Sequence, residues 1–339
     1  MFKTRARACD DDARWVTDER SRARSRMVAE MEEDEQGEAP AAQAQPVLGP
    51  KEWVGLASMP AATQQALLTA LGKLRERNVN EMTVIFIGKQ GVGKSSTVNT
   101  LLNERVAPSS PFQPENVRPL LAGRMAAGFT LNVLDTPGLL DGDSVSARGL
   151  MALRAALNGR KVDAFVFTDR LDTWRVDNAD RAIFTALAEN FGAELWERTI
   201  LGFSHAQTTP TDGKPYEEFV AARVEQYRAA VRSTLGMKNL ELPYVLIENG
   251  SRCKTNGDGE KVVNDKPWVT DMVSTMVDVA SVGEGYEYDH SKAGKKLDPN
   301  NKHKIWILPL FLIQVFVLRP LLIGQIRRDV KKAEAKGKK

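Results

Sequence analysis

The sequence is poor in the residues that build disulfide frameworks and metal centres. Its 339 residues include two cysteines, Cys9 and Cys253, and three histidines. The cysteines lie far apart and lack the spacing typical of a zinc site. We therefore expect a reducing compartment, no disulfide framework and no Cys/His metal cluster. The length suits one large domain with extensions, or two small domains.

A strong charge of one sign is also absent. Lys and Arg number 47 against 44 Asp and Glu, which gives a formal net charge of +3. No basic helix is interleaved with aromatic residues, so we expect no nucleic acid partner. Residues 1–50 are charged and poor in apolar side chains, which predicts a disordered arm. The runs DDD and EEDE in this arm distinguish it from an organelle transit peptide, which would be poor in acids.

The rest of the chain alternates short apolar runs with amphipathic helical stretches. The strand-like runs are MTVIFI, FTLNVLD, VDAFVFT, RTILGFS and YVLIEN. This alternation predicts an α/β domain over residues 51–282, with a mainly parallel sheet and helices on both faces. In such sheets ligands bind at the carboxyl ends of the strands, and each motif below follows a predicted strand.

A phosphate-binding loop follows the first of these strands. The segment GKQGVGKSST matches the pattern G-x-x-x-x-G-K-[ST] and precedes a predicted helix, so the fold class is that of the P-loop NTPases. Its backbone N–H groups surround phosphate oxygens, Lys94 reaches the outer phosphates, and Ser95 supplies a hydroxyl to Mg²⁺. The predicted nucleotide-binding residues here are Gly88, Lys89, Gln90, Gly91, Val92, Gly93, Lys94, Ser95 and Ser96.

The segment DTPG closes a second strand about forty residues further on. Asp135 at a strand end facing the loop is suited to hold Mg²⁺, usually through a water molecule, and the Gly138 N–H is suited to meet a γ-phosphate. Asp135 and Ser95 are therefore the predicted metal residues, while Lys94 and Gly138 are predicted to act in catalysis. The alternative role for Asp135 is that of a cap, in which its side chain accepts hydrogen bonds from the backbone of the following turn.

Two further strand ends are candidates for reading the base. They carry SHAQ (204–207) and ENGSRC (248–253). The commonest GTPase pattern has Asn/Thr-Lys-x-Asp at the first, so His205 replaces the lysine and Gln207 replaces the guanine-reading carboxylate. Glu248 is suited to supply a carboxylate in its place, with the His205 ring over the base and Asn249 on an exocyclic group. The alternative for His205 is a loop histidine hydrogen-bonded to the backbone.

These motifs together resemble the Toc GTPases, the protein-import receptors of the chloroplast outer envelope. The resemblance covers Trp53 to Ser281 and is carried by GKQGVGKSSTVNTLL, FTLNVLDTPGLL, DAFVFTDRLDTWRVDNAD, SHAQ and ENGSRC. It implies a receptor with GTP or GDP and Mg²⁺ as cofactors. The implied partners are preprotein transit peptides, a β-barrel channel, and either a second copy or a larger Toc GTPase with which it forms a dimer.

The resemblance also gives two residues roles. Arg170 in TDRLD matches the family's arginine that reaches across the dimer to the partner's nucleotide, and whether it is catalytic or only holds the dimer stays open. Its alternative is an intrachain salt bridge to Asp169 or Asp172. Leu139 follows DTPG where many GTPases have a water-orienting glutamine, so we expect slow intrinsic hydrolysis.

Residues 107–123 lie between the two phosphate motifs and are predicted to hold the first switch loop. The segment is rich in proline and polar residues and contains no threonine to close over Mg²⁺. Ser109 and Ser110 are the hydroxyl residues of the segment, and neither is assigned this role.

An apolar segment near the C-terminus predicts the location. Residues 305–326 are 22 residues long, with Trp306 at one end and basic residues on both sides, which is typical of a membrane helix. We expect one tail-anchoring span in the chloroplast outer envelope, a polar linker over 283–304, a basic tail over 327–339 and a domain facing the cytosol. Arg319 lies within the span, where we expect it to extend to the headgroups or to face a partner helix.

Two other functions fit part of the pattern. A tail-anchored endomembrane GTPase of the immune-associated or septin-like type would share the phosphate loop but needs neither SHAQ nor DRLD. A scaffold that binds nucleotide without hydrolysing it is compatible with Leu139. Organelle location separates the first alternative from an import receptor, and hydrolysis rates with and without a partner separate the second.

Overall fold

A computed structural model describes residues 50–108, 118–141, 144–207, 211 and 213–289. Several predicted features lie outside these residues: the charged arm, the first switch residues Ser109 and Ser110, most of the linker, the apolar segment 305–326 with Arg319, and the basic tail. Among the residues described, no helix combines the length and the apolar character that crossing a membrane requires.

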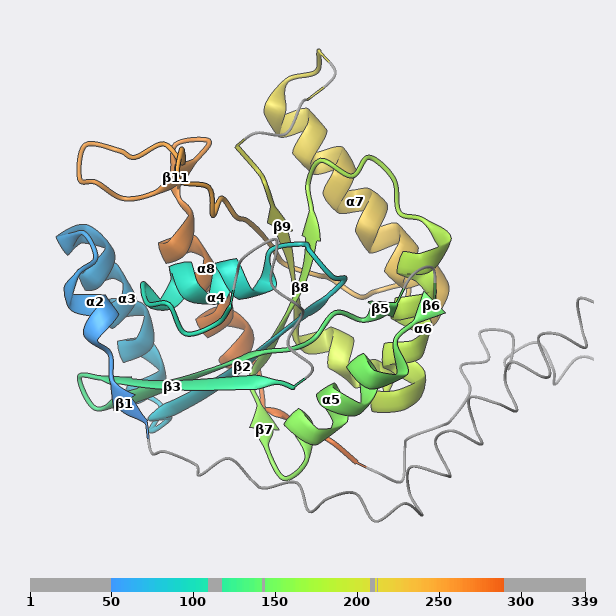
Figure 1. The fold of residues 1–339 in the computed structure, drawn as a ribbon, viewed down its shortest axis with the longest axis horizontal. Coiled ribbons are helices and arrows are strands. Elements are labelled where there is room, and N and C mark those ends of the chain that lie inside the picture. The colour runs from blue at the N-terminus through green and yellow to red at the C-terminus, as the bar shows by residue number, and fades with distance from the viewer. Residues whose placement is uncertain (1–49, 109–117, 142–143, 208–210, 212, 290–339) are drawn as a thin grey trace, which may run out of the picture. The chain divides into compact units, whose positions relative to one another are not determined.

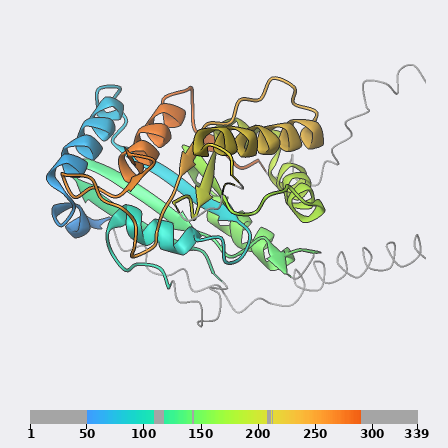
Figure 2. The ribbon, with the colours of Figure 1, turned by 90° about the horizontal axis from the view of Figure 1, so that it is seen from above.

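The described chain contains a seven-stranded sheet with helices on both sides (Figures 1 and 2). The strand order is β1-β3-β4-β2-β8-β9-β10, and each neighbouring pair is parallel except β3 and β4. The predicted α/β class with a mainly parallel sheet is therefore confirmed. The strands of this sheet are β1 (Lys51–Glu52), β2 (Glu81–Gly88), β3 (Leu120–Ala126), β4 (Phe129–Asp135), β8 (Ala164–Arg170), β9 (Thr199–Ser204) and β10 (Tyr244–Leu246).

Helices connect most of these strands. Helices α3 and α8 pack against each other, and α6 packs against α7. The helical elements are α2 (Val54–Ala57), α3 (Ala61–Arg75), α4 (Lys94–Leu102), α5 (Ala147–Leu157), α6 (Asn178–Phe191), the 3₁₀ helix η1 (Ala193–Arg198), α7 (Tyr216–Leu235) and α8 (Trp268–Ala280). Short antiparallel pairs form between β5 (Leu140–Asp141) and β6 (Ser144–Val145), and between β11 (Val262–Val263) and β12 (Lys266–Pro267).

The central strands are buried on both faces, which explains their continuous apolar sequences. All six residues of β9 are buried, and seven of the eight residues of β2 are buried. Aromatic rings from four elements meet beside β8: Phe167, Phe184, Trp196 and Tyr227. The ring centroids of Phe184 and Trp196 are 5.3 Å apart in an edge-to-face arrangement. This packing fixes the carboxyl ends of the central strands, where the predicted motifs lie.

Strand β3 changes one sequence prediction. The segment 107–123 was predicted to be a loop, but its last residues, Leu120–Gly123, belong to β3 and pair antiparallel with β4. Alternate residues of β3 are exposed or half-buried, because this strand lies near the edge of the sheet. The predicted loop is therefore shorter at its C-terminal end.

The domain also continues past residue 282. Strand β13 (Tyr286–Glu287) lies in the predicted linker, but it pairs antiparallel with β7 (Lys161–Val162). Tyr286 is buried, and its hydroxyl donates a hydrogen bond to the carbonyl of Phe191 at 2.5 Å. The start of the predicted linker is thus part of the folded domain.

A largely buried ion pair holds the β3 edge against the loop after α4. The Arg124 Nε and Nη2 atoms donate to one Glu104 carboxylate oxygen at 2.8 and 2.7 Å, and the Gly55 N–H donates to the other at 3.0 Å. Burial alone would raise the pKa of Glu104, but these hydrogen bonds outweigh it and hold the pKa below its usual range. The fold therefore favours the charged carboxylate.

Glu104→Gln is expected to lower the free energy of unfolding by about 2 kcal/mol at neutral pH, since it weakens a mostly buried ion pair in which two arginine N–H groups donate to one carboxylate oxygen. A depressed carboxyl pKa stabilises the fold above the unfolded-state pKa, and this contribution is lost as the pH falls through the folded-state pKa. The difference between variant and wild type should therefore shrink below about pH 4. Urea denaturation at several pH values measures it.

Glu225→Gln is the matched control, because Glu225 is 59% exposed in its pair with Arg232. It is expected to change the free energy of unfolding by less than about 0.5 kcal/mol. Equal costs for the two substitutions would contradict the structural role of the Glu104 pair.

Candidate functional site

The phosphate loop joins β2 to α4 and depends on glycine at both of its ends. Gly88 has φ +145°, and a Cβ at this position would lie 2.2 Å from the Thr168 carbonyl oxygen. Gly93 has φ +97° and is the residue that precedes α4. Lys94 is buried, and its ammonium donates to the carbonyl oxygens of Gly88 at 3.3 Å and Lys89 at 2.6 Å. The loop and the helix N-terminus thus have the arrangement that binds phosphate.

The two predicted metal residues lie in contact. Ser95, in the first turn of α4, donates its hydroxyl to an Asp135 carboxylate oxygen at 2.5 Å. Asp135 is the last residue of β4, which neighbours β2, and it is 4% exposed. A hydroxyl and a carboxylate are oxygen ligands of the type that Mg²⁺ prefers. The residues therefore fit a magnesium ion beside the phosphate loop.

The DTPG segment is fixed to the phosphate loop by backbone contacts. The Leu139 N–H donates to the Gly88 carbonyl at 3.0 Å, and the Thr136 hydroxyl donates to the Phe86 carbonyl at 2.6 Å. Helix α5 begins so close that a Cβ on Gly149 would lie 2.6 Å from the Gly138 carbonyl oxygen. Gly138 therefore lies beside the loop, and the contact of its N–H with a γ-phosphate stays a prediction. The Leu139 side chain is fully buried and belongs to the core.

The two predicted base loops meet through Glu248. Its carboxylate is 5% exposed and accepts hydrogen bonds from the N–H groups of Gln207 at 3.1 Å and Gly250 at 2.9 Å. The negative charge of Glu248 also contributes, after burial, to raising the pKa of Tyr216 to about 12. A buried carboxylate that follows β10 at the ligand edge of the sheet is the type of acceptor that guanine requires.

The other base-loop residues lie close by, and two of them have contacts that the sequence did not predict. His205 has φ +56°, and its Nδ1 atom lies 3.0 Å from the Ser204 hydroxyl. The Gln207 amide donates to the Arg252 carbonyl at 3.1 Å and accepts from the Lys254 N–H at 2.7 Å. The Asn249 amide donates to the Thr97 hydroxyl of α4 at 2.8 Å. In this structure Gln207 and Asn249 thus connect the base loops to their surroundings.

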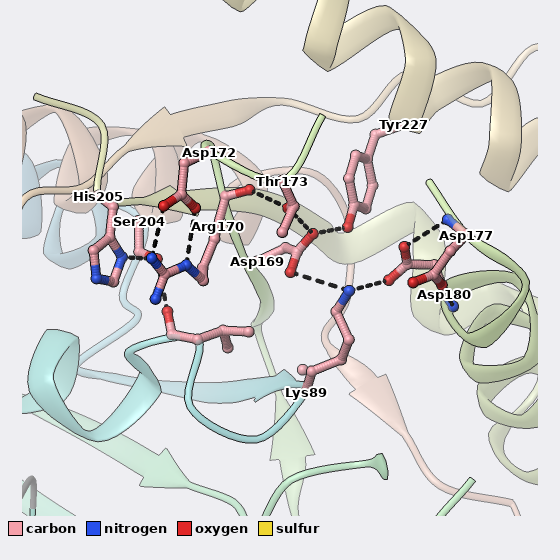
Figure 3. Close-up of polar contacts among 12 residues, drawn as sticks. Lys89, Asp169, Arg170, Asp172, Thr173, Asp177, Asp180, Ser204, His205 and Tyr227 are labelled. Carbon is pink, nitrogen blue, oxygen red and sulfur yellow. Dashed lines mark hydrogen bonds and ion pairs between the residues drawn. The ribbon is translucent and has the colours of Figure 1, made fainter. Parts of the chain in front are cut away.

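Arg170 forms the intrachain bridge that was its alternative role. The guanidinium donates two hydrogen bonds to the Asp172 carboxylate, at 2.8 and 2.6 Å (Figure 3). The Arg170 side chain is 38% exposed and the Asp172 side chain 27%. The hydrogen bond from Arg170 is the main reason why the pKa of Asp172 falls below its usual range. The pair lies at the end of β8, beside His205 (Figure 3).

A buried charge cluster next to Arg170 was missed at the sequence level. It comprises Lys89, Asp169, Asp180, Arg223 and Tyr227. These residues come from the phosphate loop, β8, α6 and α7, and their sequence separations reach more than one hundred residues. No local pattern reports such pairing. Of these five residues, the sequence predicted a role for Lys89 at the nucleotide and for Asp169 as an alternative partner of Arg170.

Comparison with known proteins adds independent information. Residues 82–256 match the model of the AIG1 family. The chain is 40% identical to Translocase of chloroplast 34 of Pisum sativum, over 83% of this chain and 92% of that protein. It is 36% identical to Translocase of chloroplast 33 of Arabidopsis thaliana, over 83% of this chain and 96% of that protein.

Solved structures show the same similarity. The crystal structure of Arabidopsis thaliana Toc33 with GDP and Mg²⁺ has a TM-score of 0.67 and 38% identity, covering 70% of this chain and all of the other. The crystal structure of a dimerization-deficient arginine-to-alanine mutant of the same protein also has a TM-score of 0.67, with 37% identity and coverage of 70% and 99%.

Proposed function

Because this chain belongs to the AIG1 family, and within it to the chloroplast translocase GTPases, we propose that it is a GTP-regulated receptor for protein import at the chloroplast outer envelope. One observation carries the proposal: the phosphate loop, the Ser95–Asp135 pair and the Glu248 carboxylate all follow strands at one edge of the sheet. Toc33 of Arabidopsis thaliana, similar in fold, has been crystallised with GDP and Mg²⁺ and with GMPPNP and Mg²⁺.

The phosphates occupy the loop at the N-terminus of α4. The ammonium of Lys94 exchanges its carbonyl partners for the outer phosphates, and the Gly138 N–H meets the γ-phosphate. Ser95 would hold Mg²⁺ through its hydroxyl and Asp135 through a water molecule, and the ion would neutralise part of the phosphate charge. The Leu139 side chain lies in the core and has no group to orient a water molecule, which supports slow intrinsic hydrolysis.

The base lies between the loops after β9 and β10. Glu248 accepts from the guanine N1–H and N2–H donors, since each carboxylate oxygen accepts more than one hydrogen bond. His205 covers the base from the neighbouring loop, and Asn249 bonds an exocyclic group. Gln207 contributes through its N–H, which orients the carboxylate.

Pairing of two GTPase domains takes place across the nucleotide face. Arg170 exchanges Asp172 for phosphate oxygens of the partner's nucleotide, for which its planar set of donors is suited. The partial exposure of the Arg170 side chain supports this exchange. Trp174, four residues further along the chain, is 50% exposed and packs edge-to-face on Phe219, so it offers apolar surface to a partner domain. Dimerization is described as important for the GTPase activity of the translocon components atToc33 and psToc159.

The proposal extends to the location and the other partners, for which the predicted apolar segment and the similarity to the chloroplast translocases are the support. The segment 305–326 anchors the chain in the outer envelope by its C-terminal end, with the GTPase domain facing the cytosol. The receptor recognises preprotein transit peptides and delivers them to a β-barrel channel. It forms a homodimer, or a heterodimer with a larger Toc GTPase.

Nucleotide selectivity and turnover of the purified full-length chain test the GTPase proposal. We expect GTP to displace a fluorescent guanine nucleotide at least about 100-fold better than ATP, because ATP presents no paired donors to Glu248. Steady-state hydrolysis should remain far below about 10 s⁻¹, the median for enzymes. Equal competition by ATP would exclude the guanine site, and a complete absence of hydrolysis with and without a partner would favour a scaffold.

A further inference from the structure

Lys89 is the first variable residue of the phosphate loop, and its side chain points toward α6. Its carbonyl oxygen accepts a hydrogen bond from the ammonium of Lys94 at 2.6 Å. Its own ammonium lies 2.7 Å from Asp180 and 3.4 Å from Asp169 (Figure 3). The Lys89 side chain is 15% exposed. One residue thus joins the phosphate-binding lysine to two carboxylates outside the loop.

Those carboxylates are deeply buried. The Asp169 side chain is 1% exposed and the Asp180 side chain 0%. Asp169 also contacts Arg223 at 3.3 Å and accepts a hydrogen bond from the Tyr227 hydroxyl. The Arg223 guanidinium lies 4.7 Å from the centre of the Tyr227 ring. Two cations therefore balance two anions in a site with little access to water.

Loss of the Lys89 charge would leave one of the two buried carboxylates without a cation. An unpaired buried carboxylate is strongly unfavourable, because neither water nor a cation compensates its charge. Burial is the largest cause of the raised pKa of Asp180, the hydrogen bond from Lys89 opposes it, and the neighbouring Asp169 adds to it. Asp180 also accepts from the Asp177 N–H in the capping box of α6. Lys89 therefore stabilises both the carboxylate pair and the start of α6.

The cluster continues directly to Arg170. Asp169 precedes Arg170 in β8, and the Thr173 hydroxyl donates to the Arg170 carbonyl at 2.7 Å. Arg223 donates to the same Thr173 hydroxyl at 3.0 Å. A continuous set of contacts thus runs from Lys94 through Lys89 and Asp169 to the segment that carries Arg170. Figure 3 shows the part of this set from Lys89 to Arg170.

We propose that Lys89 is a positioning residue that couples the phosphate loop to the Arg170 segment through Asp169 and Asp180. This inference rests on the proposed function, in which Arg170 acts across the dimer. Lys89 fixes the position of the phosphate loop relative to the end of β8. A nucleotide that orders the loop therefore also orders the strand end that carries Arg170. The effect is energetic coupling between two sites, so a change at the phosphate loop alters the nucleotide dependence of pairing.

The experiment uses the full-length chain and compares Lys89→Met with Lys89→Arg. GTP affinity is measured by competition, and dimerization with GDP and with a non-hydrolysable GTP analogue is measured by light scattering. We expect Lys89→Met to weaken GTP binding about tenfold. We also expect it to reduce, by about the same factor, the ratio of the dimer dissociation constants measured with GDP and with the GTP analogue. Lys89→Arg keeps a cation beside the buried carboxylates, so its GTP affinity should stay within about threefold of wild type. Lys73→Met, at an exposed lysine, is the matched control.

Lys89→Met/Asp180→Asn separates coupling from simple destabilisation. The second substitution removes the uncompensated carboxylate, so we expect the melting temperature to recover relative to Lys89→Met while the nucleotide dependence of pairing stays lost. A Lys89→Met chain that matches Lys73→Met in GTP affinity and pairing would overturn this inference alone. A wild-type chain that binds GTP but does not pair would overturn the coupling together with the pairing step of the proposed function.

Discussion

Glu248→Gln is expected to lower the affinity for GTP by about 100-fold and to leave the weak affinity for ATP unchanged. The carboxylate is the acceptor proposed for the two adjacent donors of guanine, and hydrogen bonds to a charged group contribute about 1.5 to 3 kcal/mol. An amide has one acceptor oxygen and would direct its NH₂ group at a donor. Competition binding with GTP and ATP measures both affinities on the same preparation.

The Glu248 substitution also affects local structure, so its control must report on folding. Glu248 accepts from the Gln207 and Gly250 N–H groups, and its loss will lower the melting temperature. Glu241→Gln, at a side chain that is 75% exposed, should change neither affinity nor melting temperature. Unchanged GTP affinity in Glu248→Gln would show that another group reads the base. Equal losses for GTP and ATP would indicate a folding defect.

Gly88→Ala is expected to have the largest effect on stability of any single substitution in the phosphate loop. At φ +145° an L-residue is strained, and the added Cβ would lie 2.2 Å from a carbonyl oxygen of the neighbouring strand β8. Relief requires β2 and β8 to separate where they pair. We expect a loss of at least about 3 kcal/mol in the free energy of unfolding, together with a loss of nucleotide binding.

Gly91→Ala is the matched control within the same loop. Gly91 also has a positive φ, +71°, but a Cβ there would meet no atom within 4 Å. Its expected cost is about 1 kcal/mol, since only the backbone conformation opposes it. Urea denaturation of the two variants separates conformational strain from the steric clash. Equal costs would contradict the close approach of β2 and β8 at Gly88.

The sequence predicted those parts of the molecule that depend on local patterns. The phosphate loop requires glycines at fixed positions between a strand and a helix, so its residues were predicted together and lie together. The continuous apolar runs predicted buried parallel strands, because both faces of the sheet are covered. The resemblance to the Toc GTPases rested on the same segments, and it is confirmed by relatives that match 83% of the chain.

Other features depend on pairing between distant segments. Strand β3 lies next to the edge strand β1, and its first residues, Leu120–Gly123, were predicted as the end of a loop. Only two of its seven residues are buried, so it lacks the continuous apolar run that predicts a central strand. Strand β13 has two residues and exists through its pairing with β7. The contacts of Gln207 with the loop at 252–254, and of Asn249 with Thr97, likewise need the folded chain. Composition and periodicity carry no information about such partners.

The buried charge cluster is the clearest example. Its ion pairs join Lys89 to Asp180, and Asp169 to Arg223, across four elements. Nothing in the sequence marks Asp180 or Arg223 as buried, because both lie in predicted amphipathic helices, where most ion pairs are exposed and contribute little. Because the pairs are buried, loss of one partner would strongly destabilise the fold. Burial is a property of the assembled fold and cannot be read from the local sequence.

The measurement that most directly tests the central claim is the molar mass of the full-length chain with GDP and with a non-hydrolysable GTP analogue. Wild type, Arg170→Ala and the exposed control Arg175→Ala are compared at several concentrations. If nucleotide controls pairing through Arg170, wild type and Arg175→Ala will form a dimer whose affinity depends on the nucleotide. Arg170→Ala will remain monomeric even at about ten times the concentration at which wild type is dimeric. A dimer of the same affinity in Arg170→Ala, or one that ignores the nucleotide, would contradict the account.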